Sequence, residues 1–464
     1  MDILKKLPGN DGSYLKITRF LILAFVAECT FGGSGRWLEI GPLSIRMILF
    51  AACFVMTLPY VLRDIRRLAA NLQVIVTVAY GVYLLVCAVI GIRTGNQMGF
   101  IWADISTMMT LALLPGFMAV MSEQSMINRA VDVLYWSAAV VAAITVAMHF
   151  ILVVMSQKQF DALYELITGS YMGGIAELKT GMQRVYLRSQ MFLQVGIVYG
   201  VWKMGCVPDA KRRVFWAVNG LMATACILSY TRGFWLGLGA SACLLLLLGV
   251  RYWKKFISIA ARMLAVFMVF TVLSTVFYRG PVMLIEVVNR FDPSLIVYEG
   301  DKTTHFEHEP DEENMDDAID KSNADAVKTR QETIFYSHQR IAQHPILGNG
   351  LGENLDEIRD DGRTEYMYMD QIVKTGFVGL ALFLGVYFSF VGVQTGNNLA
   401  MRKKGKKHPE WTDPVFRDRF LTAAYLGIAV TSFFNPFLNN PMGIMLLLLT
   451  STAVYTTRNS NKEV

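Results

Sequence analysis

Charged residues are scarce in this sequence. Asp, Glu, Lys and Arg make up 17% of its 464 residues, whereas soluble domains contain about 25%. Apolar residues make up 54%, and the mean hydropathy is +0.39. These values exclude an ordinary soluble domain and predict an all-α polytopic membrane protein.

Cysteines are also few, and their spacing matches no disulfide or metal-binding motif. None of the six cysteines lies in the long hydrophilic segment 278–366, and no Cys-x-x-Cys spacing occurs. We therefore expect no disulfide framework, no metal and no cofactor. The opening MDILKKLPGNDGSYLK lacks an apolar run followed by a cleavage site, so we expect no removable signal peptide.

Long apolar runs fill most of the chain. A run of about 20 residues can cross the ~30 Å hydrocarbon core of a bilayer. We predict twelve spans, at residues 16–31, 42–62, 72–92, 99–121, 131–155, 190–204, 213–229, 233–250, 257–277, 367–393, 419–437 and 441–457. The chain then divides into transmembrane helices 1–9 (1–277), a loop domain with short helices and an acidic insert (278–366) and transmembrane helices 10–12 (367–464).

The placement of Lys and Arg predicts the orientation. Alternate connectors are rich in these residues, most of all 402–408 (RKKGKKH), while the short connectors between them hold only Arg36, Arg93 and Arg232. Because Lys and Arg concentrate on the cytoplasmic side, we expect both termini in the cytoplasm and segment 278–366 outside. The net charge of +6 follows from this bias, and no motif indicates nucleic-acid binding.

The predicted spans contain few ionisable residues, and the ones singled out here are Glu28, Arg46, Asp104 and His149. Each falls in the outer half of its span. Charges at membrane depth are costly and face a cavity or a partner. Two interpretations remain open, a structural Glu28–Arg46 pair and a polar cavity that opens outward. We see no path of ionisable residues through the inner half of the spans, which argues against a proton-coupled transporter.

Two connectors contribute isolated cations to the outer side. Segment 156–189 carries Arg184 and Arg188, which would share a face on the short interfacial helix that we expect there. A solvated basic face and binding of an anionic head group or diphosphate are both open. Arg232 stands in the tight turn SYTRGFWLGL, where it would either anchor lipid phosphate or act in an active site.

The outer segment 278–366 begins with an acidic insert. Residues 299–320 hold many carboxylates around His305 and His308. Because the spacing is loose and acids surround both histidines, we interpret this stretch as a solvated, disordered insert and assign no metal.

Residues 329–380 concentrate the polar residues of the chain. On a helix over 326–343, Arg330, Ile334, Ser337, His338 and Ile341 share a face, so we expect that face to pack on the membrane domain. The turn HPILGNGLG follows. Its glycines allow close backbone approach, and no strand precedes them, which excludes a nucleotide-binding fingerprint.

These features together resemble the bacterial O-antigen ligase and O-antigen polymerase superfamily. The shared features are a large outer loop after the ninth span, an Arg-Gly turn after the seventh (Arg232), an Arg-led helix (Arg330), the HPILGNGLG turn and a Gly-x-x-Gly span entrance at Gly376 and Gly379. The resemblance implies a GT-C-like membrane fold of about 12 transmembrane helices with a large periplasmic loop between helices 9 and 10.

The resemblance also implies the chemistry and the site. Family members transfer a glycan from a polyprenyl diphosphate to an acceptor hydroxyl. Arg232 and Arg330 would act in catalysis and bind the diphosphate together with Arg184 and Arg188. In the ligases a catalytic histidine stands eleven residues before the first glycine of Gly-x-x-Gly. Here that position is Glu365, which is similar to some polysaccharide polymerases.

We accordingly expect Glu365 to be the general base, with His338 in reserve. The predicted function is a metal-independent, inverting polymerase of undecaprenyl-diphosphate-linked repeat units of O-antigen or exopolysaccharide, at the periplasmic face of the inner membrane. Its partners would be the lipid-linked donor, the glycan acceptor, membrane lipids and a chain-length regulator protein. The alternatives are an O-antigen ligase acting on lipid A-core and a polysaccharide transporter or flippase.

Overall fold

Helices form nearly all of the described structure. The computed structural model describes residues 12–33, 39–40, 43–170, 172–178, 180–248, 252–291, 315–355, 358, 366–403 and 410–463. The first half contains α2 (Gly12–Phe31), α3 (Ile45–Arg63), α4 (Ile65–Ala69), α5 (Leu72–Thr94), α6 (Met98–Met108), η2 (Met109–Leu113), α7 (Leu114–Val120), α8 (Gln124–Val154), α9 (Gln157–Gly169), η3 (Arg188–Gln190), α10 (Met191–Cys206) and α11 (Asp209–Leu228). The second half contains α12 (Arg232–Leu248), α13 (Trp253–Phe277), α14 (Val282–Phe291), α15 (Met315–Gln343), α16 (Met367–Lys403), α17 (Pro414–Thr431) and α18 (Pro441–Glu463).

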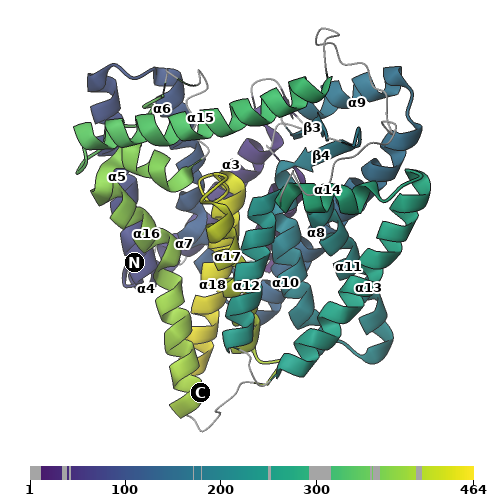
Figure 1. The fold of residues 1–464 in the computed structure, drawn as a ribbon. Coiled ribbons are helices and arrows are strands. Elements are labelled where there is room, and N and C mark those ends of the chain that lie inside the picture. The colour runs from purple at the N-terminus through teal and green to yellow at the C-terminus, as the bar shows by residue number, and fades with distance from the viewer. Residues whose placement is uncertain are drawn as a thin grey trace.

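Two short antiparallel hairpins accompany the helices. Strands β1 (Glu39–Ile40) and β2 (Leu43–Ser44) pair with Glu39 opposite Ser44. Strands β3 (Gly173–Glu177) and β4 (Gln183–Leu187) pair with Gly173 opposite Leu187. The long helices run side by side, while α9, α14, α15 and the β3–β4 hairpin lie across one end of the bundle, which we name the α15 end (Figure 1).

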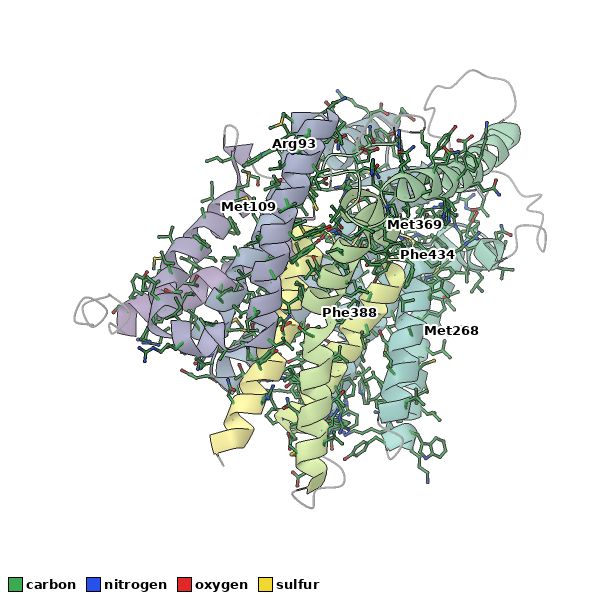
Figure 2. All side chains as sticks on the ribbon, turned by 90° about the vertical axis from the view of Figure 1, so that its left-hand side faces the viewer. Arg93, Met109, Met268, Met369, Phe388 and Phe434 are labelled. Atoms are coloured by element: carbon green, nitrogen blue, oxygen red, sulfur yellow. The ribbon has the colours of Figure 1, made fainter. Side chains whose placement is uncertain are left out.

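Within the described residues, six helical stretches are long and apolar enough to cross a membrane: α3, α5, α6 to α7, α8, α13 and Met367–Met401 of α16. Their exposed apolar side chains, such as Met109 and Met268, lie on the outside of the bundle (Figure 2). The chain is therefore a polytopic helical membrane protein. The other predicted spans also fall on helices, namely α2, α10, α11, α12, α17 and α18, so the total of twelve stays a prediction.

Several of these less apolar helices are enclosed by protein. In α17 nearly every residue from Val415 to Ala429 is buried. A helix that faces other helices can carry polar groups that a lipid-facing helix cannot. In α17 the buried Arg417 donates to the Asp418 carboxylate (Nη2–Oδ1, 2.6 Å) and to Asn128 (Nη1–Oδ1, 2.8 Å). Burial on all sides explains why composition alone gives a weak span signal here.

Small residues bring α12 and α17 into close contact. A Cβ atom added at Gly237 would lie 2.1 Å from Thr431 Oγ1, and one added at Gly427 would lie 2.0 Å from Ser241 Oγ. The Thr431 hydroxyl also donates to the Gly233 carbonyl (2.9 Å). Close approach through Gly, Ser and Thr is the usual packing of membrane helices. It fixes the first turn of α12 against the end of α17.

Of the two interpretations of the ionisable residues in the spans, the structural ion pair between Glu28 and Arg46 is confirmed. Arg46 Nε and Nη2 donate to the two Glu28 oxygens (2.7 and 3.1 Å), and Nη2 also donates to the Gly33 carbonyl (2.9 Å). Both side chains are buried. His149 is likewise buried and bonded to Ser274 (Nε2–Oγ, 2.9 Å). These groups have partners within the bundle.

The HPILGNGLG turn inserts its backbone between α5 and α16. The Gly350 N–H donates to the Lys374 carbonyl (3.1 Å), and the Leu351 N–H donates to the Cys87 carbonyl (3.0 Å). At this contact α16 is kinked, because Gly376 has φ 64° and ψ −172°. The expected close backbone approach of the glycines is thus confirmed, and its partner is the membrane domain itself.

A buried charge cluster secures the same turn. Asp104 of α6 accepts from the Gly352 N–H (Oδ2, 2.9 Å) and from Lys374 (Oδ1–Nζ, 3.0 Å). Lys374 also pairs with Asp370 (3.3 Å). The end of α15 is therefore tied to α5, α6 and α16 at once.

We expect Gly350→Ala to abolish stable folding. Gly350 has φ +93°, and an added Cβ would lie 2.2 Å from the Gly91 nitrogen, so a cost of about 4 kcal/mol or more is expected. Gly95→Ala is the matched control, because Gly95 has φ +86° and open space around its Cβ position. It should cost only about 1–2 kcal/mol. Thermal unfolding of both variants in detergent measures the difference, and equal losses would contradict the packing argument.

Candidate active site

Arg232 stands at the start of α12, at the α15 end of the bundle (Figure 1). Its side chain is exposed. The preceding residues Ser229, Tyr230 and Thr231 form the turn from α11, in which Tyr230 has a positive φ of 47°. The N-terminus of a helix carries partial positive charge and favours anions. The positive charge of Arg232 and the partial positive charge of the α12 N-terminus therefore favour an anion at the same position.

Arg184 of β4 reaches this turn. Its Nε donates to the Ser229 carbonyl (2.6 Å), and its Nη2 donates to the Thr231 hydroxyl (3.0 Å). The guanidinium carbon also lies 5.3 Å from the centre of the Tyr186 ring. Burial, and secondarily the charge of Arg290, lowers the pKa of Arg184 to about 10. Arg184 thus braces the residues before Arg232 and adds a second positive charge.

The local structure around Arg184 and Arg188 differs from the prediction. A helix does form early in the segment, as α9, but Arg184 lies on β4 and Arg188 begins η3. They therefore do not share a helical face. The alternating pattern of Gln183–Leu187 suits a strand, and it pairs with a glycine-rich partner so closely that a Cβ at Gly173 would lie 1.9 Å from the Tyr186 carbonyl oxygen. Arg188 is exposed.

Arg290 of α14 is a third cation at this place, and the sequence analysis missed it. Burial lowers the pKa of Arg290, and so does the charge of Arg232. The Glu286 carboxylate acts in the opposite direction and raises it. Glu286 is 2% exposed and accepts from the Thr180 N–H (Oε1, 2.8 Å), which holds α14 on the β3–β4 hairpin. No motif surrounds Arg290. The available signal was the pattern of 282–291, which is typical of an amphipathic helix ending in Arg290.

The predicted packing face of α15 is only partly confirmed. Ser337 is buried and Ile341 is half-buried, as expected, but Arg330, Ile334 and His338 are exposed, and Thr333 is buried instead. Small hydroxyl side chains let the backbone of α15 come close to the membrane domain, which the bulkier Ile334 would prevent. The helix is therefore rotated by about one residue from the predicted face, and Arg330 and His338 lie on its exposed side.

Glu365 falls outside the described residues. The next residue, Tyr366, is half-buried, and α16 starts at Met367. His305 and His308 of the acidic insert are outside the described part as well. Within the described ranges no three His, Cys, Asp or Glu side chains are grouped so that they could hold a metal ion.

The arrangement at the α15 end can bind an anion. Arg232 and the α12 N-terminus face outward, Arg184 and Arg290 contribute charge from two further elements, and Glu286 is the carboxylate that acts on this group. Arginine is always charged and grips phosphate oxygens with two parallel donors. A phosphate-containing ligand is thus the chemistry that these residues suit.

A family model described as O-antigen ligase matches residues 217–384. The matched range runs from α11 into α16 and includes Arg232, Arg290 and Arg330. No curated protein matches the chain. In a membrane protein built of apolar helices, the predicted resemblance to the O-antigen ligase and O-antigen polymerase superfamily is therefore confirmed over these residues.

Proposed function

We propose that this chain is a membrane glycosyltransferase that polymerises polyprenyl-diphosphate-linked oligosaccharide repeat units at the periplasmic face of the bacterial inner membrane. The observation that carries the proposal is the position of Arg232, at the N-terminus of α12 and beside Arg184 and Arg290, inside the range that matches the O-antigen ligase family. That family implies glycan transfer, and the cations suit a diphosphate leaving group.

In the proposed reaction an acceptor hydroxyl attacks the anomeric carbon of the donor glycan. The bond from that carbon to the diphosphate oxygen breaks, the hydroxyl proton goes to a base, and the diphosphate carries away the bonding electron pair. A single displacement inverts the anomeric centre. Arg232 and Arg330 stabilise the charge that develops on the diphosphate, and each such preorganised group contributes about 3–4 kcal/mol. Arg184 and Arg188 add to the binding of the diphosphate, and no metal is needed.

Glu365 is the proposed base, with His338 in reserve. An unperturbed Glu has a pKa of about 4.3, so Glu365 is ionised and ready to accept a proton at neutral pH. Neighbouring arginines lower the pKa of a carboxyl group, and partial burial raises it. For Glu365 to act as the base, partial burial would have to offset the effect of the arginines.

The charge bias of the connectors supports the proposed orientation. By this bias we expect the termini in the cytoplasm, and the α15 end, which also carries Arg93 at the end of α5 (Figure 2), in the periplasm. The lipid-linked donor then reaches the site from the outer leaflet. The expected partners are undecaprenyl-diphosphate-linked glycan, the growing chain, membrane lipids and a chain-length regulator.

An O-antigen ligase is the second candidate, because the matching family model carries that description. Deletion of the gene separates the two. We expect a polymerase deletion to leave single repeat units on the lipid carrier, since no unit can be added to another. Mass spectrometry of the carrier-linked glycans would instead detect long chains if the protein were a ligase.

We expect Arg330→Ala to lower the rate of polymerisation about 10²-fold, because it removes a cation from the departing diphosphate. Lys328→Ala is the matched control. Lys328 is an exposed cation on the same helix, and among the described residues its ion-pair partner is Glu332 at 3.9 Å, so its loss should leave the rate unchanged. Glycan length on gels, at equal protein level, measures both. Equal chain lengths in the two variants would reject the role of Arg330.

We expect Glu365→Gln to remove the acidic limb of the pH–rate profile. A base must be deprotonated, so the wild-type rate should fall as the pH drops through the pKa of Glu365. His338→Gln should keep that limb. The measurement is the initial rate with purified protein and lipid-linked repeat units between pH 4 and pH 8. Loss of the limb in His338→Gln alone would transfer the role of base to His338.

A further inference from the structure

Buried polar groups without partners lie in the turn before Arg232 and at the end of α14. The Tyr230 hydroxyl, the Nε of Arg290 and both side-chain polar atoms of Asn289 are buried and bond to nothing in the described part of the chain. Tyr230 is 2% exposed and Asn289 is 5% exposed. Most buried polar atoms in proteins have a partner, and leaving one without a partner is costly. Such a group of unbonded atoms is typical of a site whose ligand is absent.

The charges at this place are out of balance. The Arg290 guanidinium is close enough to interact electrostatically with both Arg184 and Arg232, and among the described residues Glu286 is the carboxylate that interacts with Arg290. Three positive charges and one negative charge leave an excess of two among these groups. Like charges in a partly buried place repel one another, and an anion bound between them relieves the repulsion.

Hydrogen bonds hold the elements that carry Arg184, Arg232 and Arg290 together. Arg184 uses two of its donors on the α11–α12 turn, through Ser229 and Thr231. Glu286 ties α14 to the β3–β4 hairpin through Thr180. Among the described residues neither Arg232 nor Arg290 is engaged in an ion pair, in contrast with the paired Arg46. Their guanidinium groups therefore remain available to a ligand.

We propose that Arg290 and Tyr230 complete the diphosphate subsite with Arg232, as ligands that no sequence motif identifies. This inference rests on the proposed function, because it assigns the anion of the donor to these side chains. The Arg290 guanidinium donates to phosphate oxygens from α14, and the Tyr230 hydroxyl donates from the α11–α12 turn. A diphosphate diester carries two negative charges, which matches the excess of two positive charges.

The alternative is that both residues only stabilise the fold. Tyr230→Phe separates the two roles. A hydroxyl without a partner contributes nothing to the fold, so its removal should leave the melting temperature unchanged or raise it. If the hydroxyl binds phosphate, the same variant loses affinity for a diphosphate. A fold role alone predicts the reverse pattern, a lower melting temperature with unchanged affinity.

Binding is measured with the full chain in nanodiscs, with farnesyl diphosphate as the probe and inorganic diphosphate as the lipid-free comparison. We expect Arg290→Ala to weaken binding of farnesyl diphosphate about tenfold, the loss of one charged hydrogen-bonding group. Arg290→Lys should fall between Arg290→Ala and wild type, because it keeps the charge and loses the two-pronged geometry. Tyr230→Phe should weaken binding severalfold.

Arg279→Gln is the matched control. Arg279 is an exposed cation in the α13–α14 connection, and its loss should not change the affinity. Parallel losses for inorganic diphosphate would show that these side chains recognise the anion and would support the subsite. Losses for the farnesyl probe alone would show recognition of the lipid chain and would contradict it.

Unchanged affinity in Arg290→Ala and Tyr230→Phe, while Arg232→Ala binds weakly, would overturn the inference and leave the proposed function standing. The proposed function fails separately, if glycan length in cells does not depend on Arg232 although purified protein binds the diphosphate through Arg290. Binding and glycan length are thus independent measurements of the two proposals.

Discussion

The contact between α12 and α17 is the constraint on which the candidate site depends. Membrane helices gain little from the hydrophobic effect when they associate in lipid, so small residues that allow close contact decide where they pack. Gly233, Gly237 and Ser241 of α12 meet Gly427 and Thr431 of α17. Larger side chains at these positions would push the helices apart and displace Arg232, which directly precedes the first of these glycines. The position of Arg232 is thus set by residues that have no part in the proposed chemistry.

A second contact fixes the other side of the site. The glycine turn after α15 bonds through its backbone to α5 and α16, and the Asp104–Lys374–Asp370 cluster closes the same junction. A backbone contact of this kind allows no adjustment by side-chain rotation. The C-terminus of α15 is therefore fixed. The rest of the helix runs across the bundle at the α15 end, so the position of Arg330 follows from the length and direction of that helix (Figure 1).

The sequence predicted what depends on composition and on local geometry. Apolar runs located the helices, and the positive φ of glycines explained the turn at 344–352. The sequence misplaced the buried side of α15 by about one residue, because Thr333 packs by being small and carries no apolar signal, whereas the apolar Ile334 is exposed. It also could not identify Arg290, whose importance comes only from its closeness to Arg232 and Arg184 in space. Strand β4 was missed because five residues between helices give too short a pattern.

The excess of positive charge also bears on the choice of base. A cationic site lowers the pKa of either a glutamate or a histidine that lies near it. For a histidine, whose pKa is ordinarily about 6.5, this change reduces its ability to take a proton at neutral pH. A glutamate stays ionised, and the arginines stabilise its negative charge in the state without bound donor. When the donor diphosphate binds, it neutralises the arginines, and the pKa of the glutamate rises again. Binding of the donor therefore strengthens the proposed base at the moment at which the acceptor hydroxyl must lose its proton.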